Sequence, residues 1–179
     1  MKIALTGTPG CGKSTVAREL KKIGYKVVKV EELAKKFDCI LSKNDEIVVD
    51  VDKLAREFSK VNFDGIIEGH LSHLLNPDIA IVLRCNPIIL KKRLEKRGWS
   101  KSKVLENVEA ELIDVILVEA LECKKIYEID TTNRDAKEVA KIIDELIKGE
   151  DIDKFKPGKI DWIKEIGDDI DLFLRKNNI

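Results

Sequence analysis

The chain is 179 residues long, enough for one domain with a sizeable hydrophobic core, and its 33 basic and 33 acidic side chains cancel. A balanced charge excludes the strong positive field that gathers nucleic acid or anionic membranes nonspecifically, so any such partner has to be recognised locally. No apolar stretch has the form of a signal peptide or a membrane span, and the cysteines form no C-x-x-C pair. We therefore expect a cytoplasmic monomer with reduced thiols and no membrane contact.

The first elements surround a glycine-rich loop. Residues 3–5 are a short apolar run that predicts a strand buried on both faces. The stretch GTPGCGKST at 7–15 follows and matches the phosphate-loop pattern G-x-x-x-x-G-K-[ST]. The next residues predict a helix ended by Gly24, with one apolar stripe formed by Val16, Ala17, Leu20 and Ile23. The pattern therefore has the strand before it and the helix after it that a phosphate loop needs.

The loop predicts polyphosphate binding. Its glycines admit backbone angles that a Cβ resists, and its N–H groups and the helix amino terminus would face one anion. Lys13 would reach the β- and γ-phosphates as a catalytic group, and the Ser14 hydroxyl would bind Mg²⁺. The residues assigned to the nucleotide phosphates are Gly10, Gly12, Lys13, Ser14 and Thr15. The alternative is a glycine-rich turn with a surface lysine.

Further along the chain, strands and helices alternate. Apolar runs predict four more strands, at 25–30, 65–69, 78–85 and 127–132. Helical spacing predicts helices at 31–37, 51–58, 87–98, 102–123 and 134–150. Residues 38–50 are polar and irregular, and 99–103 form a short basic loop. The alternation predicts an α/β fold of the P-loop NTPase type, a doubly wound five-stranded parallel sheet flanked by helices. Its ligand crevice would lie at the carboxyl ends of the strands.

We expect one domain over residues 1–179, ending in a C-terminal helical extension at 150–179. The extension is amphipathic, with apolar side chains at Trp162, Ile163, Ile166, Ile170, Phe173 and Leu174. The interpretation favoured here is a closing helix that covers one edge of the core. A partner-docking surface is the alternative.

Two arginines are candidates for catalysis. Arg93 and Arg97 are four residues apart on one predicted helix and precede the basic loop. Such a pair can lay guanidinium groups over a polyphosphate as charge spreads onto its oxygens. A short basic hinge beside Gly98 is typical of a closing lid, which we place at residues 96–106.

Polar residues at the end of the strand at 65–69 form a second candidate group. Glu68 would emerge beside the phosphate loop, where a carboxylate can hold a Mg²⁺-bound water or orient the attacking group. His70 would form hydrogen bonds at the crevice as a catalytic residue, and His73 is interpreted as structural. Two histidines without a third ligand make a poor zinc site.

Four stretches together carry a resemblance to a known family: GTPGCGKST, EELA, EGHLSH and RLEKRGWSKSKVLENVEAEL. They resemble the adenylate kinase isoenzyme six family of archaea and eukaryotes, also called the coilin-interacting nuclear ATPase family. The resemblance runs to about residue 133. It implies a nucleoside monophosphate kinase fold, Mg²⁺-dependent transfer of the ATP γ-phosphoryl to AMP or a related monophosphate, a side ATPase activity, and a role in small ribosomal subunit (rRNA) maturation.

The resemblance also implies particular sites and a partner. It places Arg97 at the adenine of ATP, a monophosphate-binding segment at residues 30–53, and an acid-x-histidine pair on Glu68 and His70. The implied partner is a basic small-subunit ribosomal protein of the S-eleven family, bound transiently on the pre-30S particle. Candidate acidic surfaces for it are Glu106, Glu109, Glu111, Asp114 and Glu119 on the helix at 102–123, and Asp168, Asp169 and Asp171 in the tail.

The sequence departs from ordinary adenylate kinases, which carry an Asp-Gly-aromatic-Pro-Arg stretch whose arginine holds the AMP phosphate. EGHLSHL at 68–74 supplies no such arginine. Two other functions therefore stay open. One is an ATP-driven ribosome assembly factor with vestigial kinase activity. The other is a small-metabolite kinase of the shikimate or gluconate type, which needs a cationic acceptor pocket that the sequence does not reveal between residues 30 and 64.

Overall fold

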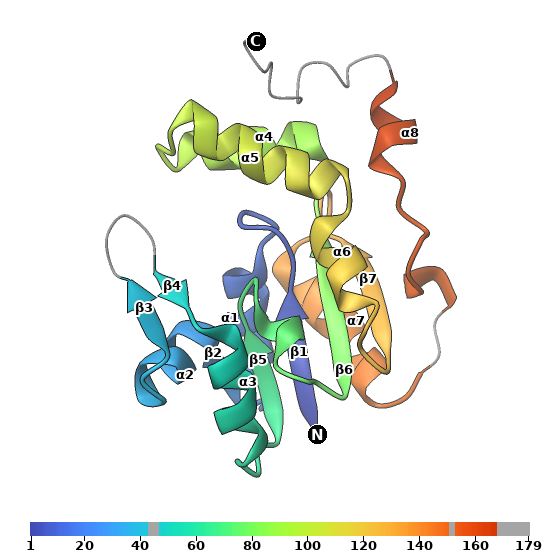
Figure 1. The fold of residues 1–179 in the computed structure, drawn as a ribbon. Helices are drawn as coiled ribbons and strands as arrows, with labels where there is room; N and C mark the ends of the chain where they lie inside the picture. The colour runs from blue at the N-terminus through green and yellow to red at the C-terminus, as the bar shows by residue number, and fades with distance from the viewer. Residues whose placement is uncertain (43–46, 151–152, 168–179) are drawn as a thin grey trace.

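The computed structural model describes residues 1–42, 47–150 and 153–167, so the expectations for Ile170, Phe173 and Leu174 and for the tail aspartates lie outside the described residues. A parallel sheet forms the centre of the molecule (Figure 1). Its order is β2-β5-β1-β6-β7, with β1 (Lys2–Thr6), β2 (Val27–Lys29), β5 (Gly65–Glu68), β6 (Ile79–Arg84) and β7 (Ile126–Asp130). The predicted doubly wound five-stranded sheet is confirmed.

Helices cover both faces of this sheet because alternate strand residues point in opposite directions. Ile3 and Leu5 face one side and Ala4 the other. The first side is covered by α1 (Lys13–Lys22) and α7 (Ala136–Ile147). The second is covered by α2 (Val30–Lys36), α3 (Val51–Ser59), the 3-10 helix η1 (Ser72–Leu74) and α6 (Val115–Ala120).

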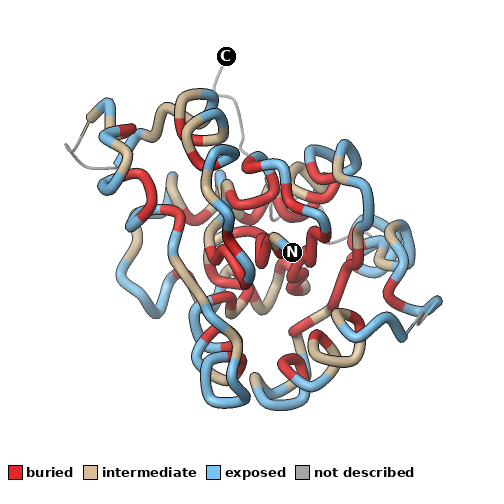
Figure 2. The backbone as a smooth tube through the Cα atoms, turned by 90° about the horizontal axis from the view of Figure 1, so that it is seen from below, coloured by how far each residue is buried: buried red, intermediate tan, exposed pale blue. Residues whose placement is uncertain are grey.

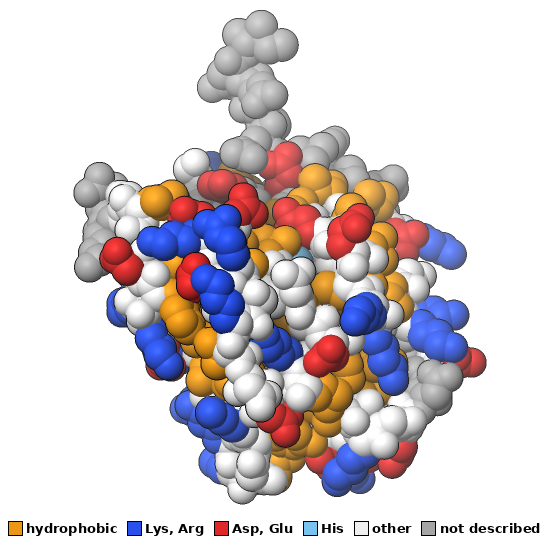
Figure 3. Space-filling view, turned by 60° about the horizontal axis from the view of Figure 1, so that its bottom comes forward, with side chains coloured by type: hydrophobic (Ala, Val, Ile, Leu, Met, Phe, Trp, Pro, Cys, Tyr) orange, Lys and Arg blue, Asp and Glu red, His pale blue; other side chains and the backbone are white. Residues whose placement is uncertain are grey.

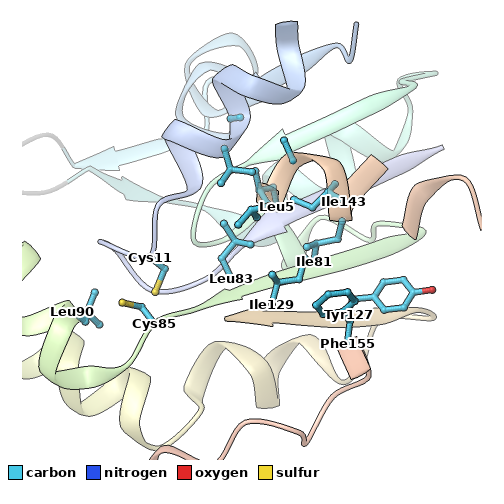
Figure 4. Close-up of a cluster of buried hydrophobic side chains, with 14 of the residues drawn as sticks. Leu5, Cys11, Ile81, Leu83, Cys85, Leu90, Tyr127, Ile129, Ile143 and Phe155 are labelled. Carbon is cyan, nitrogen blue, oxygen red and sulfur yellow. The ribbon is translucent and has the colours of Figure 1, made fainter. Parts of the chain in front are cut away.

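The main hydrophobic cluster lies between the sheet and the pair α1 and α7. Leu5 and Ile81 from the strands meet Ile143 from α7 there (Figure 4). Seen from below, the buried backbone gathers at the centre and the exposed segments surround it (Figure 2). No helix in the described part of the chain is long and apolar enough to span a bilayer. On the face drawn in Figure 3, basic and acidic side chains are interspersed.

Two helices lie side by side beyond the carboxyl ends of the strands: α4 (Pro87–Lys96) and α5 (Lys101–Leu112) (Figure 1). The turn between them is shorter than the predicted basic loop at 99–103. The Ser100 hydroxyl accepts a hydrogen bond from the Lys103 N–H and caps α5, so the helix already begins at Lys101. The predicted lid at 96–106 is therefore the tip of a helical hairpin.

The single helix predicted at 102–123 is wrong, because α5 ends at Leu112 and α6 begins at Val115. Asp114 separates them in the left-handed region, with φ of 60°. Its carboxylate pairs with the guanidinium of Arg84, which is 1% exposed. A short polar side chain tolerates this backbone conformation better than an apolar one. The break therefore serves a tertiary contact.

The proposed acidic surface on this helix is also wrong in part. Glu111 is 3% exposed and faces the interior, and Asp114 pairs with Arg84. Glu106 and Glu119 remain exposed, and the Glu119 carboxylate lies 3.0 Å from Nε2 of His73. Three of the five acidic residues predicted on one surface, Glu111, Asp114 and Glu119, therefore contact buried side chains.

Residues 38–50 contain structure that the sequence did not predict. Two short strands, β3 (Ile40–Ser42) and β4 (Val48–Val49), pair antiparallel. They are too short for an alternating pattern to stand out, and they form a hairpin beside α2 and α3 (Figure 1). Leu41 and Val48 expose 68% and 48% of their surface. The described residues of the predicted monophosphate-binding segment thus form α2, the two short strands and the start of α3.

The described part of the C-terminal extension covers the core. It contains the 3-10 helix η2 (Asp153–Phe155) and the short helix α8 (Trp162–Ile166). Phe155, Trp162 and Ile166 belong to the main hydrophobic cluster, whereas Ile163 is 49% exposed. Residues 153–167 therefore cover part of the core with a 3-10 turn and a five-residue helix rather than with one long closing helix.

Candidate active site

The loop between β1 and α1 has the backbone that a phosphate loop requires. Gly10 and Gly12 adopt φ of 100° and 95°, which side chains with a Cβ rarely adopt. A Cβ on Gly10 would also lie 2.6 Å from Cδ1 of Leu90 in α4. Gly12 is the N-cap of α1 and provides no side-chain cap, and no atom lies within 4 Å of its missing Cβ. The amino terminus of α1 therefore has no side-chain cap, which leaves it suited to an anion.

Lys13 lies at the centre of this loop. Its ammonium donates to the carbonyl oxygens of Gly7 and Thr8, at 2.5 and 3.1 Å, and the residue is 8% exposed. Burial lowers the pKa of Lys13, while the Glu68 and Glu111 carboxylates oppose that shift. The charge of Arg97 also lowers this pKa. A cation is thus held among the loop carbonyls, where a phosphate would be its natural counterion.

The end of β5 meets the start of α1. The Ser14 hydroxyl donates to Oε1 of Glu68 at 3.0 Å, and Glu68 is 7% exposed. Parallel pairing of β5 with β1 brings the strand end to the loop, as the sequence predicted. A hydroxyl and a carboxylate at hydrogen-bond distance are hard oxygen ligands, and Mg²⁺ is commonly held by one or two such groups plus substrate phosphates. These residues fit a magnesium ion that arrives with a nucleotide.

The two arginines of the predicted pair have different surroundings. Arg93 donates to the carbonyls of Gly10, Thr131 and Thr132, at 3.5, 3.3 and 3.2 Å. It therefore joins α4 to the phosphate loop and to the loop after β7. Arg97 follows the last residue of α4, is exposed, and lies close enough to Lys13 to affect its pKa. Arg97 is the freer of the two to contact a ligand.

The histidines after β5 also differ. His70 is exposed, and its carbonyl accepts a hydrogen bond of 3.1 Å from the Thr6 hydroxyl. His73 is 3% exposed, with Nδ1 3.0 Å from Oγ1 of Thr6 and Nε2 3.0 Å from a Glu119 oxygen. Burial lowers the pKa of His73. His73 ties β1 to α6, in agreement with its structural interpretation, and His70 lies within reach of solvent near Glu68.

A hollow of about 300 Å³ opens beside Ser14 and Glu68. Its wall includes three cations that the sequence did not single out: Arg18, Lys21 and Lys29. Arg18 and Lys21 follow Ser14 by four and seven residues, so helical spacing places all three on one face of α1. This spacing could have identified the two cations from the sequence. The sequence reveals no cationic acceptor pocket between residues 30 and 64, and these three cations lie outside that range, on α1 and β2.

Strand, glycine-rich loop and uncapped helix together define a P-loop nucleotide-binding protein of the α/β class. A family model described as an AAA domain matches residues 3–114. A protein of Archaeoglobus fulgidus named "Putative adenylate kinase" is 56% identical over 98% of this chain and 99% of its own length. A protein of the same name from Methanocaldococcus jannaschii is 44% identical over 98% of this chain and 100% of its own. The chain belongs to this family of archaeal proteins.

Solved structures resemble the fold. A shikimate kinase of Acinetobacter baumannii, solved in complex with shikimate, superposes with a TM-score of 0.59 and 16% identity. The match covers 84% of this chain and 94% of that chain. At this identity the likeness concerns the arrangement of strands and helices and leaves the acceptor open.

Proposed function

We propose that the protein is a nucleoside monophosphate kinase that transfers the γ-phosphoryl group of ATP to AMP or a related monophosphate. The observation that carries the proposal is the meeting of three features at one strand edge. These are the uncapped phosphate loop with Lys13, the Ser14–Glu68 pair, and the cationic hollow beside them. The name shared by the archaeal relatives supports the same activity.

Each residue has a distinct role in this proposal. Lys13 and the N–H groups of the loop stabilise charge that grows on the phosphoryl oxygens in the transition state. Ser14 and Glu68 would hold Mg²⁺, which neutralises phosphate charge when it is bound. Arg97 contacts ATP from the lid, and Arg93 braces the loop that it touches. His70 orients the attacking group from its exposed position after Glu68.

The acceptor would lie between this centre and the segment at 30–53. Arg18, Lys21 and Lys29 offer positive charge to its phosphate, and the hairpin offers apolar side chains such as Leu41. Closure of the short lid would exclude water, because an open site would transfer the phosphoryl group to water instead.

An acceptor panel tests the proposal. Product formation from Mg-ATP is measured with AMP, dAMP, CMP, UMP, GMP and shikimate, each against ATP alone. The proposal requires ADP formation that exceeds the ATP-only rate and saturates with at least one monophosphate. An equal rate with and without every monophosphate would leave the assembly ATPase as the function, and transfer to shikimate alone would support the small-metabolite kinase.

Replacement of Arg97 by lysine should raise the KM for ATP and lower turnover, each by about tenfold, because lysine keeps the charge but loses the planar fork and the stacking face. Steady-state kinetics with varied ATP measures both. Arg56→Lys is the matched control, since Arg56 is an exposed arginine on α3. Wild-type behaviour of Arg97→Lys would remove the proposed lid contact.

We also propose, on the resemblance alone, that the protein acts in the cytoplasm as a member of the isoenzyme six family. It would have a side ATPase activity, and it would associate transiently with a small-subunit ribosomal protein of the S-eleven family during subunit maturation. A basic partner would meet Glu106 and Glu119, the members of the predicted acidic surface that are exposed.

We expect submicromolar binding to that ribosomal protein that depends on ATP and weakens with salt, because opposite charges at an interface are screened. Calorimetry at low and moderate salt, with and without ATP, measures it. Charge reversal at Glu106 should weaken binding, and reversal at the remote Glu57 on α3 should not. Absence of binding in every nucleotide state would leave only the metabolic kinase.

A further inference from the structure

A buried carboxylate lies under the phosphate loop and has no role in the proposed chemistry. Glu111, near the carboxyl end of α5, is 3% exposed. Negative charge beside a polyphosphate site opposes nucleotide binding, and burial of a carboxylate is costly unless it is paired and hydrogen-bonded. The hydrogen bonds of Glu111 must therefore offset the cost of burying its charge at this position.

The two oxygens of Glu111 serve different parts of the molecule. Oε2 accepts a hydrogen bond of 2.6 Å from the hydroxyl of Thr8, in the phosphate loop. Oε1 accepts from Arg84 Nε at 2.8 Å, from the Cys85 N–H at 3.1 Å and from Trp162 Nε1 at 2.9 Å. A carboxylate with this many donors is fixed in position.

Thr8 connects this carboxylate to the catalytic lysine. Its carbonyl accepts hydrogen bonds of 3.1 Å from both Lys13 Nζ and the Cys11 N–H. Its side-chain hydroxyl donates to Glu111, and the residue is 2% exposed. The orientation of the Thr8 peptide, and with it the place of the Lys13 ammonium, therefore depends on the hydroxyl that Glu111 holds.

The segment after α7 is also connected to Glu111 through Arg84 and Glu128. Arg84 also donates to Oε2 of Glu128 at 3.2 Å. The other oxygen of Glu128 accepts from the backbone N–H groups of Lys159 and Ile160, at 2.5 and 3.0 Å. The backbone before α8 is thus tethered to β7. This tether holds α8 where the Trp162 indole can donate to Glu111.

We propose that Glu111 is a positioning residue that holds the phosphate loop, through Thr8, in its nucleotide-binding form. The proposal includes the Trp162 indole, which makes the segment at 153–167 part of the support of the loop. It rests on the proposed use of this loop for nucleotide. Binding of ATP to the wild-type protein is therefore measured first. If the wild-type protein does not bind ATP, the proposed use of the loop for nucleotide is refuted, which is a different result from a failure of the positioning role.

The direct test removes the hydroxyl of Thr8 without changing its shape. Thr8→Val should weaken ATP binding about tenfold, measured by calorimetry with Mg-ATP, because a hydrogen bond to a charged group is lost. Thr8→Ser keeps the hydroxyl and should bind within about twofold of wild type. Glu111→Gln should weaken ATP binding by a similar factor. Wild-type affinity of Thr8→Val would overturn the proposal, even if Glu111→Gln does not fold.

The matched control separates positioning from stability. Tyr25→Phe also removes a hydroxyl that donates to a carboxylate, that of Asp144 at 2.8 Å, and Tyr25 follows the end of α1 opposite the phosphate loop. It should lower the Tm and leave ATP affinity within about twofold. If Tyr25→Phe weakens ATP binding as much as Thr8→Val at an equal loss of Tm, the Thr8 hydroxyl and Glu111 are merely structural.

A double-mutant cycle tests the connection to the C-terminal segment. Trp162→Phe removes the indole N–H and should weaken ATP binding in the wild-type background. In the Thr8→Val background it should add less than about twofold, because the path through Glu111 is already cut. Independent, fully additive losses would overturn the role given to Trp162.

Discussion

Replacement of Lys13 by alanine is expected to abolish both phosphoryl transfer and ATP hydrolysis, lowering turnover by at least about a thousandfold. The ammonium lies among the loop carbonyls, where it can meet charge that grows on the transferred phosphoryl group. Its removal takes no apolar side chain from the core, so the fold should survive. Coupled-enzyme assays of ADP and phosphate, with circular dichroism as the check on folding, measure the effect.

Lys22→Ala is the matched control for this variant. Lys22 lies on the same helix, is exposed, and pairs with Glu19 at the surface. Its loss should change turnover by less than about twofold, since exposed pairs contribute little. Turnover of Lys13→Ala near that of wild type would refute the phosphate-loop assignment.

Replacement of Glu68 by glutamine is expected to lower turnover by at least about a hundredfold while ATP binding stays nearly intact. Glutamine keeps the shape and can still accept the hydrogen bond from Ser14, but it loses the charge that would hold Mg²⁺-bound water or orient the acceptor. Calorimetry gives the ATP affinity, and the dependence of turnover on Mg²⁺ gives the effect on the metal.

The control for Glu68→Gln lies just before the other end of the same strand. Asp64 is exposed, pairs with the amino terminus and lies far from the loop along β5. Asp64→Asn should leave turnover within about twofold of wild type. A Glu68→Gln variant with full turnover and an unchanged Mg²⁺ requirement would show that this carboxylate is only structural.

Most of the sheet could be predicted because its strands are buried on both faces. Such strands appear as continuous apolar runs, as at 65–67 and 79–83, and the loop motif fixes which edge holds the ligand. The approach of Glu68 to Ser14 followed from the same logic, since parallel strands end at one edge of the sheet.

The features that could not be predicted from the sequence include two that depend on contacts between distant residues. The break at Asp114 and the burial of Glu111 both follow from Arg84, which lies on β6 about 30 residues earlier and is 1% exposed. Within α5 alone, Glu111 is one of several carboxylates and carries no local sign of burial. The pairing of β3 with β4 could not be predicted because these strands are three and two residues long, too short for an alternating pattern to be recognised.

The most direct test of the proposed function traces the γ-phosphoryl group. The enzyme is mixed with ATP labelled at the γ-phosphate, Mg²⁺ and excess AMP in a single turnover, and the products are separated. We expect most of the label in the β-phosphate of ADP formed from AMP. We expect Lys13→Ala to form neither labelled ADP nor labelled inorganic phosphate. Label that appears only in inorganic phosphate, at the same rate with and without AMP, would contradict it.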